Sequence, residues 1–172
     1  MEASEFQREI LQMERLLYRV AWSYLNNLPD VEDAVQETLV KAWRNREKLR
    51  DSQQFRPWIC RILINQCRDM IREHKRKSFF SLENVADQLQ YQDNQLALLE
   101  IVQGLSPDLR VVMTLYYVED YTTAEIARML HIPVGTVKTR MRSARKQLRK
   151  ALRSGEENVR TEYQKLNGLS QP

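Results

Sequence analysis

Apolar residues recur every three or four positions through three segments of the N-terminal half, a spacing that predicts amphipathic helices. These helices are expected over residues 6–25, 30–47 and 57–77. Leu28 and Pro29 are expected to end the first helix, and Asp30 to cap the second. The predicted buried side of the second helix consists of Val35, Thr38, Leu39, Ala42 and Trp43.

The polar sides of the second and third helices differ in charge. On the second helix the polar row is mostly acidic and amide: Asp33, Gln36, Glu37 and Arg44. On the third helix it is a cationic stripe that contains one amide: Arg61, Asn65, Arg68, Arg72 and Lys75. A solvated helix face and a nucleic-acid surface both explain such a stripe, and this segment alone does not decide between them.

The helical pattern breaks over 78–95, where Ser, Asn, Gln and Asp are frequent, and resumes afterwards. Helices are expected over 96–104 and 107–118, the latter with Ser106 as its cap and Pro107 in its first turn. The predicted fold is all-α, with two small helical domains joined by a flexible acidic linker. The expected divisions are an N-terminal helical bundle (1–77), the linker (78–95), a C-terminal helix-turn-helix domain (96–153) and a polar tail that is frayed or weakly helical (154–172).

Residues 122–148 carry the signals of a helix-turn-helix. Thr122 and Glu125 fit a capping box, and His131 stands at a turn where the backbone often takes positive φ. Pro133 is expected to start the second helix. The predicted inner positions are Ile126, Ala127, Leu130, Ile132, Val137, Met141, Ala144 and Leu148. The predicted outer face of the second helix contains Lys138, Thr139, Arg142, Ser143 and Arg145.

Charge strengthens the prediction of a nucleic-acid partner. The net charge of the whole chain is only +4, but residues 121–153 contain nine Lys/Arg and one acid. Residues 56–77 contain seven Lys/Arg and two acids, whereas 81–100 contain four acids and no base. A segment that combines an apolar face with so many cations is typical of a DNA-binding domain.

Other features limit the possible functions. Cys60 and Cys67 lie about 10 Å apart along one helix, too far for a disulfide, and are expected to be buried thiols. The chain has no Gly-rich phosphate loop, no metal-ligand cluster and no nucleophile with a base, so we expect no enzyme activity, cofactor, metal or small-molecule substrate. The N-terminal residues lack a basic-then-apolar pattern, so a signal peptide is not expected, and no apolar run is long enough to cross a bilayer. We therefore expect a cytoplasmic protein without membrane insertion.

Three motifs in order resemble the bacterial extracytoplasmic-function (ECF) sigma factors of the sigma-70 family. The recognition-helix motif is PVGTVKTRMRSARKQL at 133–148, the core-binding motif is DAVQETLVKAW at 33–43, and the promoter-melting motif is FRPWICRILIN at 55–65. Together they lie within 6–153, which makes the resemblance more specific than any single motif. It implies a dissociable promoter-specificity subunit of RNA polymerase with no catalysis of its own.

The resemblance also implies a role for each polar surface. The residues expected to face core polymerase are Asp33, Gln36, Glu37 and Arg44, and the expected contacts are the β′ clamp coiled coil and the β flap. Those expected at the minus-10 element, where a base is flipped out, are Phe55, Trp58, Arg61, Asn65, Arg68 and Arg72. Those expected at the minus-35 element are Lys138, Thr139, Arg142, Ser143 and Arg145. An anti-sigma factor is an expected partner. Two interpretations of Glu83, Asp87 and Asp93 stay open: they mimic nucleic acid in the RNA path, or they belong to a solvated spacer.

A stand-alone helix-turn-helix regulator is the alternative. Such a regulator needs a dimer interface, and it explains neither the acidic helix face at 33–44 nor the segment 55–65.

Overall fold

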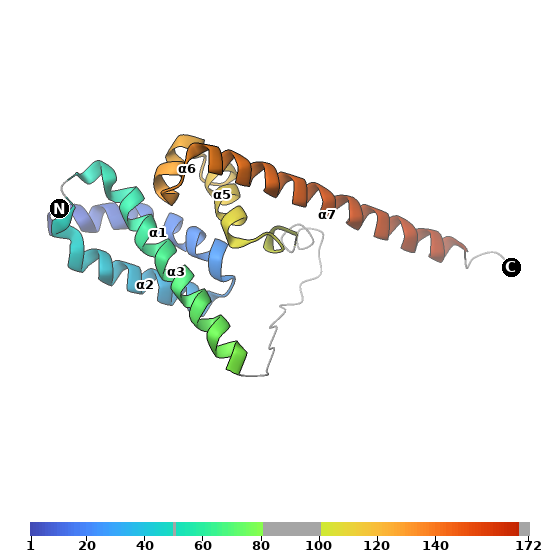
Figure 1. The fold of residues 1–172 in the computed structure, drawn as a ribbon, viewed down its shortest axis with the longest axis horizontal. Coiled ribbons are helices and arrows are strands. Elements are labelled where there is room, and N and C mark those ends of the chain that lie inside the picture. The colour runs from blue at the N-terminus through green and yellow to red at the C-terminus, as the bar shows by residue number, and fades with distance from the viewer. Residues whose placement is uncertain (50, 81–100, 169–172) are drawn as a thin grey trace.

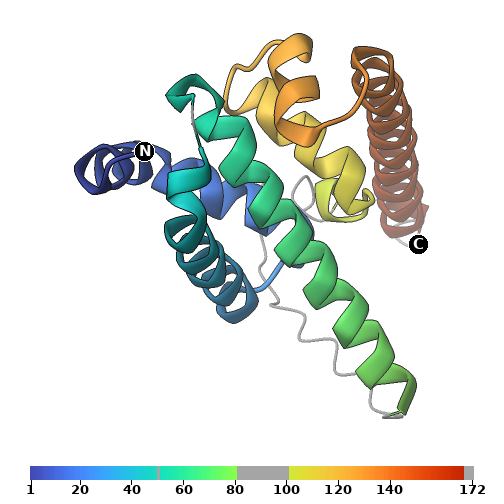
Figure 2. The same cartoon turned by 60° about the vertical axis from the view of Figure 1, so that its left-hand side comes forward.

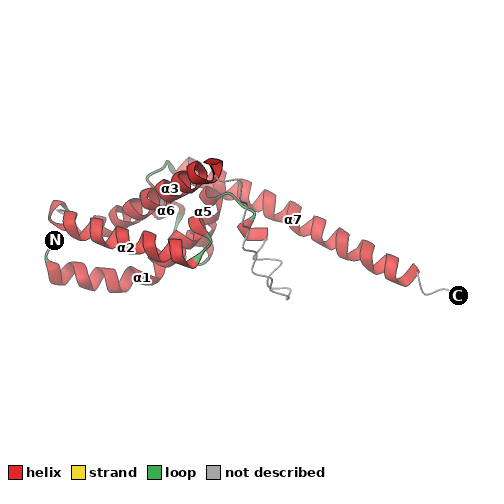
Figure 3. Cartoon of the chain, turned by 90° about the horizontal axis from the view of Figure 1, so that it is seen from below, coloured by secondary structure: helices red, strands yellow, loops and turns green. Residues whose placement is uncertain are grey.

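The computed structural model describes residues 1–49, 51–80 and 101–168; for 77–80 and 154–168 it describes the backbone alone. Within these ranges every regular element is a helix (Figures 1 and 3), which confirms the predicted all-α class. The expected linker falls mostly outside the described residues, as do Glu83, Asp87 and Asp93. Of the expected helix over 96–104, residues 101–104 are described: 101–103 are helical and 104 lies in a turn.

The N-terminal part consists of α1 (Ala3–Leu25), α2 (Leu28–Asn45) and α3 (Phe55–Phe80), each packed against the other two. Two 3₁₀ helices, η1 (Arg46–Lys48) and η2 (Ser52–Gln54), lie in the connection between α2 and α3. The apolar rows of the three helices meet in a core whose fully enclosed side chains include Met13, Leu17, Val31, Ile59 and Leu63. Burial of these rows supplies the main driving force for the bundle.

The turn between α1 and α2 differs from the prediction. α1 ends at Leu25, and Asn26 takes the left-handed conformation with φ 59°. Asn27 is the cap of α2, because its side-chain oxygen accepts a hydrogen bond from the Asp30 backbone N–H at 3.0 Å. Asp30 was therefore the wrong choice of cap: it lies in the first turn of α2, where its carboxylate faces the positive end of the helix. Leu28 and Pro29 begin α2 rather than end α1.

Aromatic rings join the three N-terminal helices at one end. Phe6 lies edge-on to Trp43 and to Phe55, with centroids 5.4 and 5.6 Å apart, and Phe55 lies 5.9 Å from Trp58. Trp43 was predicted to be buried, but 43% of it is exposed. One edge of its indole meets Phe6, while the Arg46 guanidinium covers its ring at 4.0 Å.

The C-terminal part consists of α5 (Pro107–Tyr117), α6 (Thr123–Leu130) and α7 (Val134–Gly168). Ser106 occupies the cap position of α5, but its side chain accepts no capping bond. Pro133 precedes α7, and its carbonyl accepts hydrogen bonds from the N–H groups of Thr136 and Val137. α7 continues as one helix of 35 residues, so the predicted polar tail is helical as far as Gly168.

The two parts pack against each other. α1 contacts α5, and α3 contacts α6. α3 therefore lies between α2 and the helix-turn-helix (Figure 2). One apolar cluster runs through both parts, from Leu17 and Leu63 to Leu115, Ile126 and Val137. Among the described residues no helix is long and apolar enough to cross a membrane.

Candidate nucleic-acid interface

The outer face of α3 carries four of the six residues predicted at the minus-10 element. Arg61, Asn65, Arg68 and Arg72 are spaced by four, three and four residues, so they project from one side of the helix. Arg61, Asn65 and Arg72 are exposed, and Arg68 is half-buried. The stripe is therefore present on the surface, as the spacing predicts.

Phe55 is not part of this surface. It is 0% exposed and packs edge-on against Phe6, in the core shared by α1, α2 and α3. The prediction that Phe55 contacts DNA is corrected: an enclosed ring offers no surface to a base, and its role is to anchor the start of α3.

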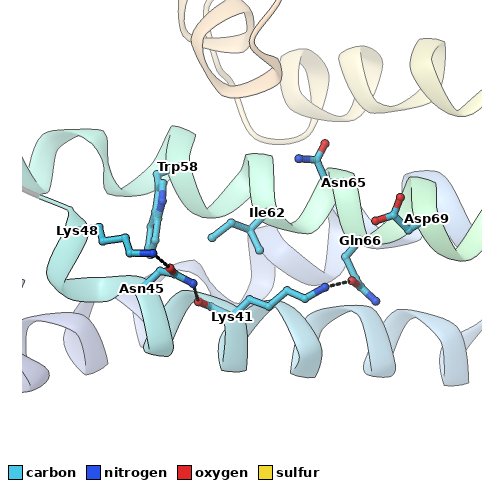
Figure 4. Close-up of a pocket in the computed structure, with 8 residues that line it drawn as sticks. All are labelled: Lys41, Asn45, Lys48, Trp58, Ile62, Asn65, Gln66 and Asp69. Atoms are coloured by element: carbon cyan, nitrogen blue, oxygen red, sulfur yellow. Dashed lines mark hydrogen bonds between the residues drawn. The ribbon is translucent and has the colours of Figure 1, made fainter.

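A cavity of about 340 Å³ lies between α2 and α3. Its lining includes Trp58 and Asn65, which the sequence placed at the minus-10 site. In Figure 4 the Asn65 amide is directed away from α2, so its hydrogen-bonding groups face outward. The cavity combines an indole, an apolar floor at Ile62 and several polar groups, a composition typical of sites for a planar polar ligand.

Sequence reasoning missed the polar lining of this cavity. Lys41 Nζ donates to Gln66 Oε1 at 2.6 Å, and Lys48 Nζ donates to Asn45 Oδ1 at 2.7 Å (Figure 4). Asn45 is itself held by its Nδ2, which donates to the Lys41 carbonyl at 2.8 Å. In the sequence, Lys41 has Glu37 four residues earlier and looks like one half of a solvated ion pair; nothing local indicates that it reaches across to α3.

The helix-turn-helix forms as its local signals predict. The Thr122 hydroxyl accepts from the Glu125 N–H, and the Glu125 carboxylate accepts from the Thr122 N–H at 2.8 Å, completing the capping box. The Thr122 hydroxyl also donates to the Glu125 carboxylate at 2.6 Å, and this bond, together with the one from the Thr122 N–H, lowers the pKa of Glu125. His131 adopts the left-handed conformation, with φ 54° and ψ 48°. Ile126, Ala127, Leu130, Val137, Met141 and Ala144 are buried, whereas Ile132 and Leu148 are partly buried.

The outer face of α7 brings together the residues predicted at the minus-35 element. Lys138, Thr139 and Arg142 are exposed, and Ser143 is half-buried. A cavity of about 560 Å³ beside this face is lined by Tyr116, Thr123, Lys138, Met141, Arg142, Arg145, Lys146 and Arg149. Five of the lining residues are cations and none is a carboxylate, so the recess is strongly positive. It lies beside the second helix of the helix-turn-helix, the element that contacts DNA in this motif.

Arg145 is held by a contact with α5. Its Nε donates to the Tyr117 hydroxyl at 2.9 Å, and its guanidinium lies 5.7 Å from the centroid of the Tyr117 ring. α5 therefore fixes the direction of this side chain, a tertiary contact that no helix pattern predicts.

The polar face of α2 lies away from α1 and α3. All four predicted core-polymerase residues, Asp33, Gln36, Glu37 and Arg44, are exposed. Val40 lies between Gln36 and Arg44 on the same face and is 42% exposed. Val40 was not among the predicted residues of this face, although its position in the series 33, 36, 37, 40, 44 places it there.

The inner face of α3 contains both cysteines. Cys60 and Cys67 are free thiols and buried, as predicted, and burial raises the pKa of each to about 12. Among the described residues no three His, Cys, Asp or Glu side chains come together in a possible metal site.

A helix-turn-helix with an open basic face, together with a second basic helix beside a polar cavity, defines a helical DNA-binding protein with two separate basic surfaces. The family model for sigma-70 region 2 matches residues 10–77, and that for sigma-70 region 4 matches residues 95–148. The chain belongs to the ECF sigma factors of the sigma-70 family, and it is an RNA polymerase sigma factor.

Individual relatives agree with this assignment. The chain is 30% identical over 155 residues to the ECF RNA polymerase sigma factor SigW of Bacillus subtilis, covering 80% of this chain and 83% of SigW. It is 30% identical over 141 residues to SigM of Mycobacterium tuberculosis, covering 80% and 72%. Among solved structures it is similar to the sigma factor RpoE in complex with the anti-sigma factor NepR from Bartonella quintana, with a TM-score of 0.72, 26% identity, and coverage of 88% and 98%.

Proposed function

We propose that the two basic surfaces divide promoter recognition between them. The open face of α7 reads the minus-35 element through Lys138, Thr139, Arg142 and Ser143, with Arg145 adding a backbone contact. α3 and its neighbouring cavity engage the minus-10 element. The observation that carries the proposal is the cavity of about 340 Å³ next to Asn65, because a flipped base needs both a recess and a polar edge to meet.

Within the minus-10 site the residues have different tasks. Asn65 presents an amide that is able to pair with a base edge, and Trp58 offers a flat surface for stacking. Arg61, Arg68 and Arg72 hold the phosphate backbone and carry no sequence information of their own. Lys41 positions Gln66 at the inner wall through its 2.6 Å hydrogen bond.

The acidic face of α2 is proposed as the core-polymerase contact. Asp33, Glu37 and Val40 combine two carboxylates with an apolar centre, an arrangement that suits a basic protein partner. The expected polymerase surfaces are the β′ clamp coiled coil for α2 and the β flap for the C-terminal part. Catalysis belongs to the polymerase, and this chain supplies binding alone.

We also infer an inhibitory partner and a location. The solved relatives RpoE and CnrH are each in complex with another protein, the anti-sigma factor NepR and the cytosolic domain of CnrY respectively. An anti-sigma factor is accordingly the expected regulator of this chain, and the cytoplasm, where the polymerase acts, is its expected location.

Run-off transcription with core polymerase and this protein tests the function. Fragments of the source genome serve as templates, and promoter-dependent transcripts are expected only when both components are present. Binding of the protein to DNA as a dimer, with no transcript and no capture of core polymerase, would instead favour the stand-alone regulator.

Asn65→Ala tests the minus-10 site in the same assay. Loss of a bidentate base contact is expected to cost about 1–3 kcal/mol, which is roughly a fivefold or larger fall in transcription at limiting protein. Gln147→Ala, at an exposed position of α7 outside the named contacts, is the control. Equal activity of the Asn65 variant and the control removes Asn65 from the site.

Glu37→Lys tests the α2 surface. Charge reversal in a complementary interface is expected to abolish capture of core polymerase, whereas the same change at Glu14, an exposed residue of α1, leaves capture intact. Equal loss in both variants indicates a general charge effect rather than a contact made by α2.

A further inference from the structure

The contacts between the two halves of the chain use residues proposed to bind DNA. Arg68 Nη2 donates to Asp108 Oδ1 at 3.0 Å, and Arg61 Nη2 lies 3.0 Å from His131 Nδ1. Asp108 belongs to α5 and His131 to the turn of the helix-turn-helix. Two of the three arginines proposed at the minus-10 backbone are therefore engaged by the C-terminal part.

Asp108 is the centre of these contacts. Its Oδ1 accepts from Arg68 and, at 3.4 Å, from the Tyr24 hydroxyl, while its Oδ2 accepts from Arg140 Nη2 at 2.8 Å. One carboxylate thus connects α1, α3, α5 and α7. The side chains of Arg68 and Asp108 are 43% and 41% exposed, so their ion pair is weak enough to open and close.

Other polar contacts hold the same interface without any proposed DNA ligand. Arg19 of α1 forms an ion pair with Glu119, which follows α5. Ser23 Oγ donates to Thr114 Oγ1 at 3.1 Å, and Arg110 Nη1 donates to Asn26 Oδ1 at 2.8 Å. These contacts allow the interface to be loosened at a distance from the α3 stripe.

We propose that Asp108 competes with promoter DNA for Arg68, so that the packed arrangement of the two halves has low affinity for the minus-10 element. A phosphate that approached Arg68 here would meet the Asp108 carboxylate, a like charge within 3.0 Å of the same guanidinium. Separation of the halves removes this carboxylate and releases Arg61 from His131. The inference rests on the proposed role of Arg68 at the DNA backbone.

Three variants test the competition. Asp108→Asn removes the ion pairs that Asp108 makes with Arg68 and Arg140, and Glu119→Gln removes the ion pair with Arg19 elsewhere in the interface. Glu14→Gln is the control. Each removes one negative charge, so a general charge effect is the same in all three. The affinity of the full chain is measured for a fluorescein-labelled, mixed-sequence, single-stranded DNA 20-mer. Asp108→Asn is expected to bind about two- to fivefold tighter than Glu14→Gln. Glu119→Gln is expected to change the affinity in the same direction.

Two further measurements identify the cause. Spin labels at Gln12→Cys and Gln147→Cys, both exposed, report the distance between the halves, which is expected to increase in both opening variants. In an Arg68→Gln background the gain from Asp108→Asn is expected to fall to less than half, because the group for which DNA and Asp108 compete is then absent and only the release of Arg61 remains.

The outcomes separate this inference from the proposed function. If Asp108→Asn and Glu119→Gln bind DNA no better than Glu14→Gln, the competition is overturned even though the protein still directs transcription. A gain that keeps its full size in the Arg68→Gln background overturns it as well. If no variant binds DNA and the wild-type chain gives no transcript with core polymerase, the proposed function fails and the competition fails with it.

Discussion

The α3 stripe and the outer face of α7 look alike in the sequence but differ in the folded chain. Both consist of cations at helical spacing opposite an apolar row. On α3, Arg61 contacts His131, Arg68 pairs with Asp108, and Arg72 pairs with Asp69. On α7, no ion pair among the described residues engages Lys138 or Arg142. The comparison teaches that a cationic pattern specifies where DNA is able to bind, whereas tertiary contacts decide which surface is ready to bind.

The largest expected effect concerns the apolar core shared by the two halves, which packs α3 against the C-terminal part. Leu115 is fully buried in the cluster that spans both halves, and Leu115→Ala is expected to lower the free energy of unfolding by about 2–5 kcal/mol. All three tryptophans belong to the N-terminal part, so urea unfolding followed by their fluorescence reports that half. A midpoint that stays at the wild-type value would show that the halves unfold independently.

Arg142→Ala tests the open face. The side chain has no intramolecular ion pair to lose, so its removal is expected to cost the full contact, about 1–3 kcal/mol of binding free energy. The measurement uses duplexes selected from a random pool by the reconstituted holoenzyme. A loss confined to selected sequences indicates a base contact, and an equal loss for all sequences indicates a phosphate contact.

Arg68→Ala tests the engaged face and is expected to have a smaller effect. Removal of this guanidinium deletes a phosphate contact but also deletes the ion pair with Asp108 that opposes DNA binding. The two changes partly offset each other, so the loss in affinity is expected to stay below about fivefold. A loss equal to that of Arg142→Ala in the same assay would contradict the difference between the two faces.

The smallest expected effect comes from the capping box at the start of α6. Hydrogen bonds from Thr122 lower the pKa of Glu125, so their contribution to stability is present above the unfolded-state pKa. It is lost as the pH falls below the ordinary carboxyl pKa and through the lower folded-state pKa. Thermal melting of Glu125→Gln is expected to depend less on pH in this range than the wild type or Glu14→Gln.

Local signals explain most of what the sequence predicted correctly. The capping box at Thr122, the left-handed turn at His131 and the apolar rows of α6 and α7 are each decided by residues a few positions apart. These features were confirmed. Asn27 was missed as a cap because Asp30, three residues later, also satisfies the simple cap preference.

Long-range packing explains the failures. Phe55 was assigned to DNA because it begins a motif that resembles the promoter-melting segment, but its environment is decided by Phe6, nearly fifty residues earlier. Asp108 looked like an ordinary first-turn acid of α5, since its partners Tyr24, Arg68 and Arg140 are distant in the sequence. The cavity beside Asn65 likewise needs α2 and α3 to be in place before Lys41 and Gln66 meet.

The length of α7 gives the C-terminal part a mechanical property. At 35 residues the helix (Figure 1) is about 52 Å long. The residues proposed to contact the minus-35 element all lie within its first twelve positions. A rotation of roughly 10° about that end therefore moves the opposite end by about 9 Å. The helix is a lever that converts a small reorientation on DNA into a large displacement, and a fluorophore attached near residue 168 becomes a sensitive gauge of how this part is oriented.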